Sequence, residues 1–496
     1  MNPIPKAYVL AIDLGASSGR GMVGCFDKGQ ITLEEVHRFD NTPITLNGTL
    51  HWDMELLFRE IKQSIVKAAS RYPIESVAVD TWGVDFGLLD EQGALLENPV
   101  HYRDGRTAGM LERAKQYISA EDHYRFSGNQ FMEINTAFQL LSLKENRPEL
   151  LTKAACMLMM PDLFHYLLCG KQCAEQTIAS TSQLYDPVNR NWSLEIITGL
   201  GLPERIFPEV VAPGTLLGTL HPALAKELGV PELKVMTVAG HDTQSAMVAV
   251  PAKEEDFLFL SCGTWSLLGT ELRAPLITDE AYGKGITNES AYDGKTAFLQ
   301  NITGLWLVQE SRREWKQEGR AYSYSQMADM AQEAEAINAY IDPDDPVFMA
   351  PGDIPARVRE YCQRTGQQIP QGDGQVLRCI YQSLAFKYRL AAEGISACTG
   401  KSYDKLHMIG GGSSAALLCR MTADAGGMDV YAGPIEATAL GSVATQLVTL
   451  GYLDNLEQVR KCIRASYSPI HYAPLASDKE EREQAYQTFQ EVIRCC

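Results

Sequence analysis

The sequence predicts an α/β protein built from two similar lobes. Strand-like apolar runs alternate with amphipathic helical patterns along most of the 496 residues, as they do in α/β proteins. A second observation is a duplicated plan, in which an apolar strand runs into a small polar turn and then a second strand. It occurs in residues 9–26 and again in residues 258–269. Hydrophobic residues make up 45% of the chain, which is enough for sizeable cores.

The first copy of this plan ends its leading strand at an acidic residue. Residues 9–13 are apolar up to Asp13, residues 15–19 form a turn of Gly, Ala and Ser, and residues 21–26 are apolar again. Loops of this composition present backbone N–H groups to an anion, because Gly allows close approach and Ser adds hydroxyl donors. Asp13 either orients Mg²⁺ beside phosphates or caps a hairpin turn. The second copy, with Gly-Thr in its turn at residues 263–264, favours phosphate binding.

The elements that follow in the first half alternate in type. An Asn-Gly pair between two short β-prone runs is the signature of a hairpin. Periodic apolar residues predict a helix after it, because residues three and four apart share one helix face. The expected elements are the hairpin at residues 47–48, a helix over 54–72, a strand over 76–85 and helices within 107–120, 140–151 and 163–170.

A domain boundary is expected where the polar residues 251–255 separate a helix from the next strand. We therefore predict an N-terminal domain over residues 1–250 and a C-terminal domain over residues 251–496. In the second domain, residues 406–409 predict a strand that runs into three glycines and then a helix. The charged tail from Ser477 predicts a surface helix.

Residues 235–243 combine a strand, a Gly turn and a helix that begins near Gln244. Asp242, or Thr243 beside it, is placed to cap this helix, since Asp and Thr are common N-cap residues. The same carboxylate would serve equally as a general base that faces a cleft, because it lies near the domain boundary and ligand sites favour interdomain clefts. The residue types alone favour the cap.

Three glycine-containing motifs differ in what they indicate. Residues 410–412 are Gly-Gly-Gly, which fits a tight turn or the close approach of a base or ribose but lacks the G-x-G-x-x-G spacing of a dinucleotide fold. Residues 394–402 resemble a P-loop with one residue too many between the glycines, and they follow a helical stretch, so we reject that interpretation. Residues 15–19 match the G-x-S-x-G elbow of hydrolases, but a strand follows where that elbow needs a helix.

Two loop segments combine aromatic rings with charges. Residues 82–85 are Trp-Gly-Val-Asp, and residues 102–106 are Tyr-Arg-Asp-Gly-Arg. Such residues suit a sugar site, where rings pack on C–H faces and charges bind hydroxyls. They also suit an ordinary half-buried loop.

The composition limits the classes of partner. The chain has 44 basic and 62 acidic side chains, a net charge of −18 and no Lys/Arg-rich run, so nucleic acid is not an expected partner. No run approaches the roughly 18 apolar residues that a membrane span needs, and the short N-terminal apolar run does not match a secretory signal. The 12 Cys residues lack the paired spacing of a zinc site, which predicts reduced thiols and a cytoplasmic location.

Taken together, these motifs resemble the FGGY family of carbohydrate kinases, which share a duplicated actin/hexokinase-like (ribonuclease H-like) α/β fold. The likeness runs from about residue 7 to about residue 475. Segments shared with the whole family are residues 13–20 (first phosphate loop), 262–264 (second phosphate loop), 410–412 (adenosine site) and 436–442. Segments closest to the members that act on L-rhamnulose are residues 51–53, 80–86, 102–104, 160–162, 241–243, 263–266, 286–289 and 304–306.

The resemblance implies a two-lobed kinase with an active-site cleft between its lobes, which uses ATP and Mg²⁺ to phosphorylate L-rhamnulose at its C1 hydroxyl. It implies that Asp242 is the base that takes the proton of that hydroxyl, while Asp13 holds Mg²⁺ through water. The implied sugar-binding residues are Gly83, His241, Asp242, Thr243 and Asn301. The implied ATP-binding residues are Ala16, Ser17, Ser18, Gly19, Arg20, Thr264, Gln309 and Gly411.

Other functions fit parts of the sequence. A related kinase acting on L-fuculose, L-ribulose or D-xylulose would differ in only a few pocket side chains. An actin-like ATP-binding switch would need neither a base at Asp242 nor the Trp-Gly-Val-Asp loop, and a sugar sensor without catalysis would not need Asp13 or Asp242. Ser290 stands where the members that act on L-rhamnulose usually have Gly. We expect it to alter a turn near the sugar pocket, which puts the exact sugar in question.

Overall fold

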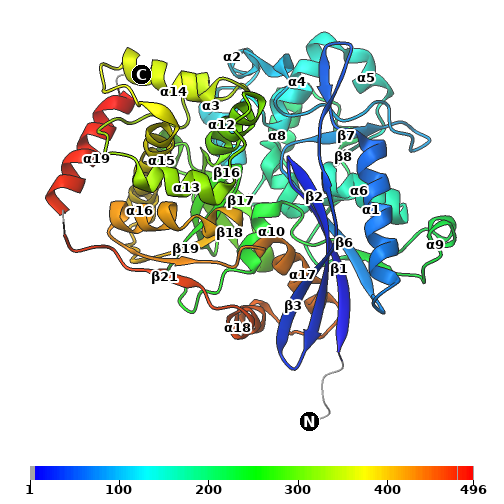
Figure 1. The fold of residues 1–496 in the computed structure, drawn as a ribbon. Helices are drawn as coiled ribbons and strands as arrows, with labels where there is room; N and C mark the ends of the chain where they lie inside the picture. Colours follow the sequence, from blue (N-terminus) through cyan, green and yellow to red (C-terminus); the bar gives the residue numbers. More distant parts are fainter. Residues whose placement is uncertain (1–5, 478, 495–496) are drawn as a thin grey trace. The chain divides into compact units, whose positions relative to one another are not determined.

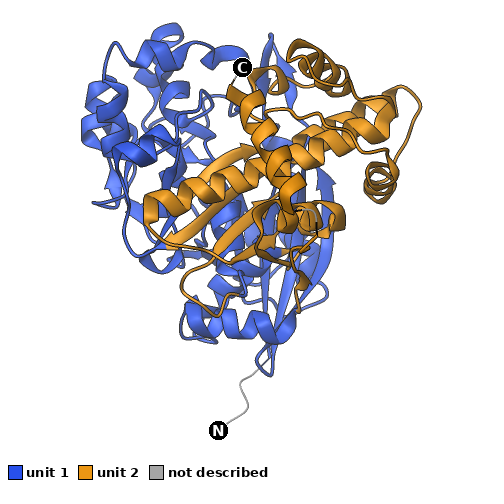
Figure 2. Ribbon diagram, turned by 90° about the vertical axis from the view of Figure 1, so that its left-hand side faces the viewer, with its two compact units in different colours: residues 1–251, 272–298, 437–467 blue, residues 252–271, 299–436, 468–496 orange. Residues whose placement is uncertain are grey.

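The computed structural model of the protein describes residues 6–477 and 479–494, and the chain divides into two compact units (Figure 2). Unit 1 takes residues 1–251, 272–298 and 437–467, and unit 2 takes residues 252–271, 299–436 and 468–496. Each unit is therefore assembled from segments that are far apart in the sequence. The linear division at residue 250 stays a prediction, because the units are sets of segments rather than two halves.

The main sheet of unit 1 has the strand order β13-β14-β6-β1-β2-β3. Its strands are β1 (Ala7–Leu14), β2 (Ser18–Asp27), β3 (Gln30–Asp40), β6 (Ser76–Thr81), β13 (Leu216–Thr219) and β14 (Lys234–Met236). β1 is antiparallel to β2 and parallel to β6, and β1, β2 and β3 run side by side in Figure 1. β1 is apolar along most of its length because a central strand is buried on both faces.

The second main sheet has the order β17-β18-β16-β15-β19-β20-β21, and its strands from β18 to β21 repeat this topology. These strands are β15 (Leu258–Cys262), β16 (Trp265–Leu272), β18 (Thr296–Thr303), β19 (Lys405–Ile409), β20 (Asp429–Ala432) and β21 (Ile470–Tyr472). In each sheet a leading strand, β1 or β15, is antiparallel to the next strand and parallel to a later one. A further parallel strand and an antiparallel edge strand follow in both. The prediction of two similar α/β lobes is confirmed.

Helices and shorter strands complete each unit. The helices of unit 1 are α1 (Met54–Ala69), α2 (Met110–Ala114), α3 (Ala120–Ser127), α4 (Thr136–Asn146), α5 (Pro148–Lys153), α6 (Met160–Cys169), α7 (Gln176–Ala179), α8 (Leu194–Gly199), α9 (Pro222–Leu228), α10 (Asp242–Val248), α11 (Asp279–Gly283), α17 (Ala437–Thr449) and α18 (Leu456–Ser466). Those of unit 2 are α12 (Trp306–Gln317), α13 (Tyr324–Glu333), α14 (Ile354–Arg364), α15 (Gly372–Thr399), α16 (Ala416–Gly426) and α19 (Lys479–Arg494). The shorter strands are β4 (Ile44–Leu46), β5 (Thr49–His51), β7 (Phe86–Leu89), β8 (Cys156–Met159), β9 (Ala174–Glu175), β10 (Tyr185–Asp186), β11 (Asn191–Trp192), β12 (Val210–Val211) and β17 (Thr287–Ser290).

Helices cover both faces of the unit 1 sheet. A Cβ on Gly21 would lie 2.7 Å from the Cβ of Ser64 on α1, and a Cβ on Gly24 would lie 2.3 Å from Cγ1 of Val443 on α17. Residues 21 and 24 face opposite sides of β2, because side chains alternate along a strand. Two glycines therefore let one helix approach each face of β2, and the sheet forms the middle layer of an α/β/α sandwich.

The local predictions in the first half are confirmed with small changes in their bounds. β4 and β5 pair antiparallel around Asn47 and Gly48, whose φ angles of 50° and 84° match the turn that an Asn-Gly pair favours. The helix expected over residues 54–72 ends at Ala69, and its first turn is capped by Asp53, which accepts the Leu56 N–H at 3.0 Å.

The charged tail forms the predicted helix, α19, and it also contributes to a core. Tyr486, Phe489 and Val492 recur every three residues, so they share one face of the helix, and all three are buried. Tyr486 and Phe489 pack in a cluster with Tyr340 and Phe386 of unit 2. The charged residues of α19 occupy the remaining faces.

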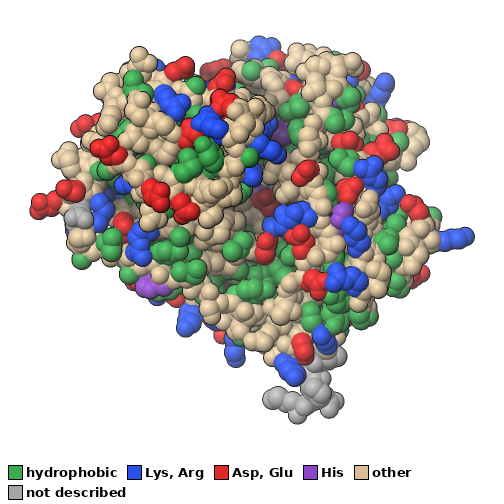
Figure 3. Space-filling model, in the orientation of Figure 1, with side chains coloured by type: hydrophobic (Ala, Val, Ile, Leu, Met, Phe, Trp, Pro, Cys, Tyr) green, Lys and Arg blue, Asp and Glu red, His purple; other side chains and the backbone are tan. Residues whose placement is uncertain are grey.

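Two further properties concern the surface. Within residues 6–477 and 479–494, no helix is long and apolar enough to cross a membrane. Acidic and basic side chains are interspersed on the face that Figure 3 shows.

Candidate active site

The turn between β1 and β2 forms a tightly bonded loop at one edge of the unit 1 sheet. The Gly15 N–H donates to the Ser18 carbonyl at 2.9 Å, and the Asn41 side-chain amide donates to the Gly15 carbonyl at 2.9 Å. The predicted ATP-binding residues of unit 1 lie in this turn and at the start of β2: Ala16, Ser17, Ser18, Gly19 and Arg20. The loop therefore has the fixed backbone that binding an anion through N–H groups requires.

Asp13 lies near the end of β1, beside this turn, and pairs with Arg20. The Nε and Nη2 atoms of Arg20 donate to Oδ2 of Asp13 at 3.0 and 2.8 Å, and the two residues are register partners in the β1–β2 pair. The Asp13 residue is only 4% exposed. These bonds direct the carboxylate at a cation rather than at the N–H groups of the turn, so they favour an electrostatic role over a turn cap.

A second acidic residue, Asp80, stands beside Asp13 on the neighbouring strand. The two are register partners in the parallel β1–β6 pair, so their side chains project to the same face. Asp80 is fully buried, and neither carboxylate oxygen has a hydrogen-bond partner among the described residues. Burial first, and then the charges of Asp13 and Asp242, raise the pKa of Asp80 well above its usual range, although the nearby Ser442 and Arg20 lower it. Asp80 therefore holds its proton more readily than an exposed aspartate does.

Asp242 is the first residue of α10 and does not cap it. The N-cap position belongs to His241, whose side chain makes no capping bond, while Oδ1 of Asp242 accepts the Thr243 N–H at 2.6 Å. The capping interpretation of Asp242 is therefore wrong, and so is that of Thr243, which lies inside the helix. The Asp242 side chain stays 33% exposed although protein surrounds it closely. Burial and the charge of Asp13 raise the pKa of Asp242, and His241 lowers it.

The turn that precedes Asp242 is held by a buried carboxylate, Glu175. Oε2 of Glu175 accepts the Gly240 N–H at 2.8 Å and the Thr177 hydroxyl at 2.6 Å, and Oε1 accepts the Thr177 N–H at 2.9 Å. A Cβ on Gly240 would lie 2.9 Å from Oε2, so only Gly lets the turn approach this acceptor. The Thr177 hydroxyl is also 3.3 Å from the His241 nitrogen, which fixes the backbone that leads into α10.

The predicted sugar loop follows β6 and contains a strained residue. Val84 has φ 67°, an uncommon conformation for a β-branched residue. Hydrogen bonds hold it there: its N–H donates to the Thr181 hydroxyl at 3.1 Å, and its carbonyl accepts the Thr136 hydroxyl at 2.6 Å. Gly83, the predicted sugar-binding residue, lies between this strained position and Trp82. Strain of this kind persists only where the surrounding structure determines it, and it clusters at functional sites.

Asp85 organises the aromatic residues of the same loop. Its Oδ2 accepts the indole N–H groups of Trp52 at 2.7 Å and Trp82 at 3.0 Å, and Oδ1 accepts from Gln139 at 3.0 Å. The two indole rings lie 4.0 Å apart, and His101 stacks on Trp52. Burial raises the pKa of Asp85 to about 6, although these donors lower it. A single carboxylate therefore fixes the orientation of both rings.

The predicted site residues of unit 2 surround the second loop. The Thr264 hydroxyl donates to Oε1 of Gln309 at 3.1 Å, which joins two of the predicted ATP-binding residues. A Cβ on Gly412 would lie 2.2 Å from Sγ of Cys262, and a Cβ on Gly410 would lie 3.2 Å from the Cys262 carbonyl oxygen, so these two glycines lie against the end of β15, whereas Gly411 faces open space. Asn301, predicted to bind sugar, lies on β18 and is half-buried.

The acidic side chains do not form a direct metal site. Across the described parts of the chain, no group of three or more His, Cys, Asp or Glu residues is arranged to hold a metal ion. The charges of Asp13 and Asp242 nevertheless raise the pKa of Asp80, and the charge of Asp13 raises the pKa of Asp242, so the three carboxyl groups lie near one another.

Sequence comparison decides the family. The N-terminal domain of the FGGY family of carbohydrate kinases matches residues 8–249, and the C-terminal domain of that family matches residues 258–450. The chain belongs to the FGGY family of carbohydrate kinases. This FGGY protein is therefore a carbohydrate kinase, as the sequence motifs predicted.

Three relatives that match this chain along almost its whole length are rhamnulokinases. The rhamnulokinase of Bacteroides thetaiotaomicron is 40% identical over 490 residues, which cover 99% of this chain and 100% of that protein. The rhamnulokinase of Halalkalibacterium halodurans is 40% identical, with 95% and 100% coverage, and that of Bacillus subtilis is 36% identical, with 97% and 98% coverage.

Solved structures support the fold. A xylulose kinase from Lactobacillus acidophilus has a TM-score of 0.82 at 17% identity, covering 99% of this chain and 98% of that one. The glycerol kinase of Plasmodium falciparum, solved with ADP, has a TM-score of 0.77 at 16% identity, with 98% of each chain covered. At this identity the likeness concerns the fold alone, and it confirms the predicted α/β class.

Sequence reasoning missed three buried acids of this FGGY kinase: Asp80, Glu175 and Glu289. Asp80 carried a usable signal, since it ends an apolar strand as Asp13 does. Glu175 carried none for its bond to Gly240, which lies 65 residues away. Glu289 stood in the 286–289 segment of the family likeness, but its partner His241 lies 48 residues away, so the segment gave it no role. Ser290 was expected to alter a turn, and that expectation is wrong: it lies in the buried strand β17, where its N–H donates to the Ser180 hydroxyl at 2.9 Å.

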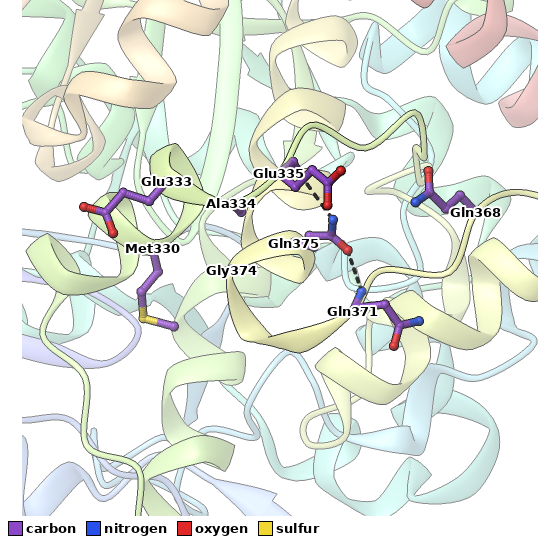
Figure 4. Close-up of a pocket in the computed structure, with 8 residues that line it drawn as sticks. All are labelled: Met330, Glu333, Ala334, Glu335, Gln368, Gln371, Gly374 and Gln375. Atoms are coloured by element: carbon purple, nitrogen blue, oxygen red, sulfur yellow. Dashed lines mark hydrogen bonds between the residues drawn. The ribbon is translucent and has the colours of Figure 1, made fainter.

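A separate pocket of about 550 Å³ lies in unit 2, between α13 and the start of α15 (Figure 4). Its lining residues are Met330, Glu333, Ala334, Glu335, Gln368, Gln371, Gly374 and Gln375. The Gln375 side chain bonds to the backbone of Gln371 and Glu335 along its wall. None of the predicted site residues is among these lining residues, so the pocket is not part of the candidate site.

Proposed function

We propose that this FGGY kinase transfers the γ-phosphoryl group of ATP to the C1 hydroxyl of L-rhamnulose, giving L-rhamnulose 1-phosphate and ADP. The observation that carries the proposal is the 40% identity over 99% of the chain with a rhamnulokinase, combined with a partly exposed carboxylate at Asp242 beside buried acids. Identity of this extent over whole chains supports a shared substrate far better than a likeness of fold does.

In the proposed reaction, Asp242 accepts the proton of the C1 hydroxyl as the hydroxyl oxygen attacks the γ-phosphorus. The bond from that phosphorus to the bridging oxygen breaks, and ADP leaves with the electron pair. Positioning and charge neutralisation do most of the catalysis in such transfers. His241 and Thr243, which flank Asp242, and Gly83 and Asn301 are proposed to bind the sugar.

The loop of residues 16–20 is proposed to bind the ATP phosphates through its N–H groups, with Thr264, Gln309 and Gly411 as the contacts of unit 2. When bound with ATP, Mg²⁺ neutralises phosphate charge. Asp13 is proposed to orient this ion through water, which is supported by its buried position near the end of β1, beside the phosphate loop. We also propose a cytoplasmic location, since thiols such as Cys262 and Cys419 are free and buried.

The test is an enzyme-linked assay of ADP release with Mg-ATP and four ketoses: L-rhamnulose, L-fuculose, L-ribulose and D-xylulose. Fast turnover on L-rhamnulose alone, with a C1 phosphate in the ³¹P NMR spectrum of the product, is the expected result. Preferred turnover on another ketose would overturn the substrate but keep the reaction. ADP release that no sugar stimulates would favour an ATP-driven switch instead.

A further inference from the structure

The imidazole of His241 lies between two carboxylates of unit 1. Its Nδ1 is 2.9 Å from Oε2 of Glu289, and its Nε2 is 3.5 Å from Oδ1 of Asp242. The side chains of His241 and Glu289 are only 9% and 4% exposed, whereas that of Asp242 is 33% exposed. The ring therefore links an acid that solvent scarcely reaches to the acid proposed to act on substrate.

Glu289 is held rigidly in this arrangement. It lies on β17, whose residues are all buried, and its Oε2 also accepts from Nε2 of Gln244 at 2.8 Å. Gln244 lies on α10, two residues after Asp242, so one carboxylate oxygen is joined to the helix start at two points. An ionised carboxylate in such a buried place is stable only with a charged or strongly bonded partner, and His241 is that partner.

The surrounding charges favour the protonated imidazole. Burial lowers the pKa of His241, but Glu289, Asp242 and Glu175 raise it by more, so that it lies above its usual value. Two further acids act on these residues: Glu175, which precedes α7, raises the pKa of His241, and Asp13 on β1 raises that of Asp242. Asp80 on β6 lies near Asp13 and Asp242, and Arg20 on β2 pairs with Asp13. As an imidazolium, His241 presents an N–H to each carboxylate.

We propose that Glu289 is a positioning residue for phosphoryl transfer, which keeps His241 protonated and oriented so that His241 in turn keeps Asp242 ionised and ready to accept the substrate proton. The proposal rests on the proposed function, because it takes Asp242 as the base. No proton moves along the three residues during the reaction: Asp242 gains the hydroxyl proton, and His241 keeps both of its own. Without the imidazolium, the burial of Asp242 and the charge of Asp13 would favour its protonated, inactive form.

The first test is the pH profile of kcat/KM for Glu289→Gln. This change keeps the shape of the side chain and removes its charge, so His241 becomes neutral and Asp242 takes up a proton at higher pH. The acidic limb of the profile is expected to move up by about 1–2 pH units, the usual effect of losing one close opposite charge. Glu289→Asp keeps the charge, so its acidic limb is expected to lie closer to that of the natural protein than the limb of Glu289→Gln does. An acidic limb that does not move in Glu289→Gln would overturn the proposal.

The matched control is Gln244→Met. It removes the other hydrogen bond to Glu289 and leaves the charge in place, so it is expected to lower stability without moving the acidic limb. Equal shifts in Glu289→Gln and Gln244→Met would show a packing effect and contradict a role for the charge. The double variant with Glu289→Gln and His241→Asn is expected to shift the acidic limb no further than His241→Asn alone, because Glu289 acts on Asp242 through the His241 ring.

A second measurement needs no substrate. The imidazole of His241 is followed by ¹⁵N NMR against pH in the whole protein and assigned with His241→Asn. It is expected to stay protonated at pH 7.5 in the natural protein and to lose its proton there in Glu289→Gln. A neutral ring at pH 7.5 in the natural protein would overturn the proposal. If no ketose is phosphorylated, the proposed function fails, whereas this titration still reports whether Glu289 keeps His241 protonated.

Discussion

The Cα of Gly441 packs directly against the backbone carbonyl of Ser245. A Cβ added to Gly441 would lie 1.7 Å from that oxygen and 2.6 Å from the carbonyl carbon. Gly441 lies on α17 and Ser245 on α10, the helix that begins at Asp242. These helices therefore meet backbone against backbone at this point, which lies within one turn of the proposed base.

Gly441→Ala is expected to displace α10, because backbone atoms cannot rotate away as a side chain would. The cost should be about 1–3 kcal/mol of unfolding free energy or more, the range for overpacking, and kcat should fall as Asp242 moves. Gly283→Ala is the matched control, since Gly283 is also helical but has open space where a Cβ would go. Urea denaturation and kcat should separate the two variants. Equal free energies of unfolding for Gly441→Ala and Gly283→Ala would contradict a rigid contact at Gly441.

Glu175 predicts a pH-dependent stability whose sign can be worked out. Burial raises its pKa to about 7 from an ordinary 4.5, against the lowering effect of its hydrogen bonds. Between pH 4.5 and 7 the folded protein therefore binds this proton more than the unfolded chain does, so the free energy of unfolding falls as pH rises through that window.

Glu175→Gln is expected to flatten this slope, because an amide does not titrate. Melting temperatures at pH 5 and pH 7.5 measure it, with Glu121→Gln, an exposed position, as control. The same variant should lower kcat, since Glu175 holds the Gly240 N–H. A slope equal to that of the natural protein would count against a titrating Glu175.

Asp13→Ala is expected to raise the KM for Mg-ATP more than the KM for sugar. Its carboxylate lies beside the phosphate loop and pairs with Arg20, so its loss should weaken metal-dependent binding by about 10–100-fold. Asp27→Asn, at the opposite end of the β1–β2 hairpin, is the control and should leave both constants unchanged. An unchanged Mg²⁺ dependence in Asp13→Ala would refute the proposed role.

The duplicated sheet could be predicted from sequence because its pieces are local. An apolar strand, a Gly-Ser or Gly-Thr turn and a second strand are each visible within 20 residues, and their recurrence 250 residues later indicates a second lobe. The division into units could not be predicted in this way. Residues 437–467 join unit 1 through contacts such as Gln446 with the Leu10 carbonyl at 3.1 Å, and nothing near residue 446 indicates that partner.

For the candidate site, too, local residue types could be predicted from the sequence, whereas contacts between distant residues could not. The residue types place Asp242 at the start of a helix. An aspartate there could be a helix N-cap or a general base, and only the geometry of the structure distinguishes the two roles. The structure shows that the N-cap is His241, so the cap interpretation loses its physical basis. Glu289 lies in the 286–289 segment that carries the family likeness, but nothing in that segment gives it a role, since its partner is a ring 48 residues earlier in the chain.

Asp242→Asn is the sharpest test of the proposed base. Asn keeps an oxygen that can accept the Thr243 N–H, so the fold should survive with its melting temperature nearly unchanged. The variant cannot accept a proton, and kcat should fall by about 10²–10⁴-fold, the usual contribution of a general base. The sugar KM should change little, because hydrogen bonding from the side chain is retained.

The pH profile supplies an independent check on the same variant. The pKa of Asp242 is raised, so the natural enzyme should lose activity as pH falls through a value above the ordinary 3.8 of Asp. Residual turnover of Asp242→Asn should lack that acidic limb, because the group that titrates is gone. A small loss of kcat matched by an equal loss of stability would instead mean that the carboxylate serves the helix, and transfer to the sugar would then need a different base.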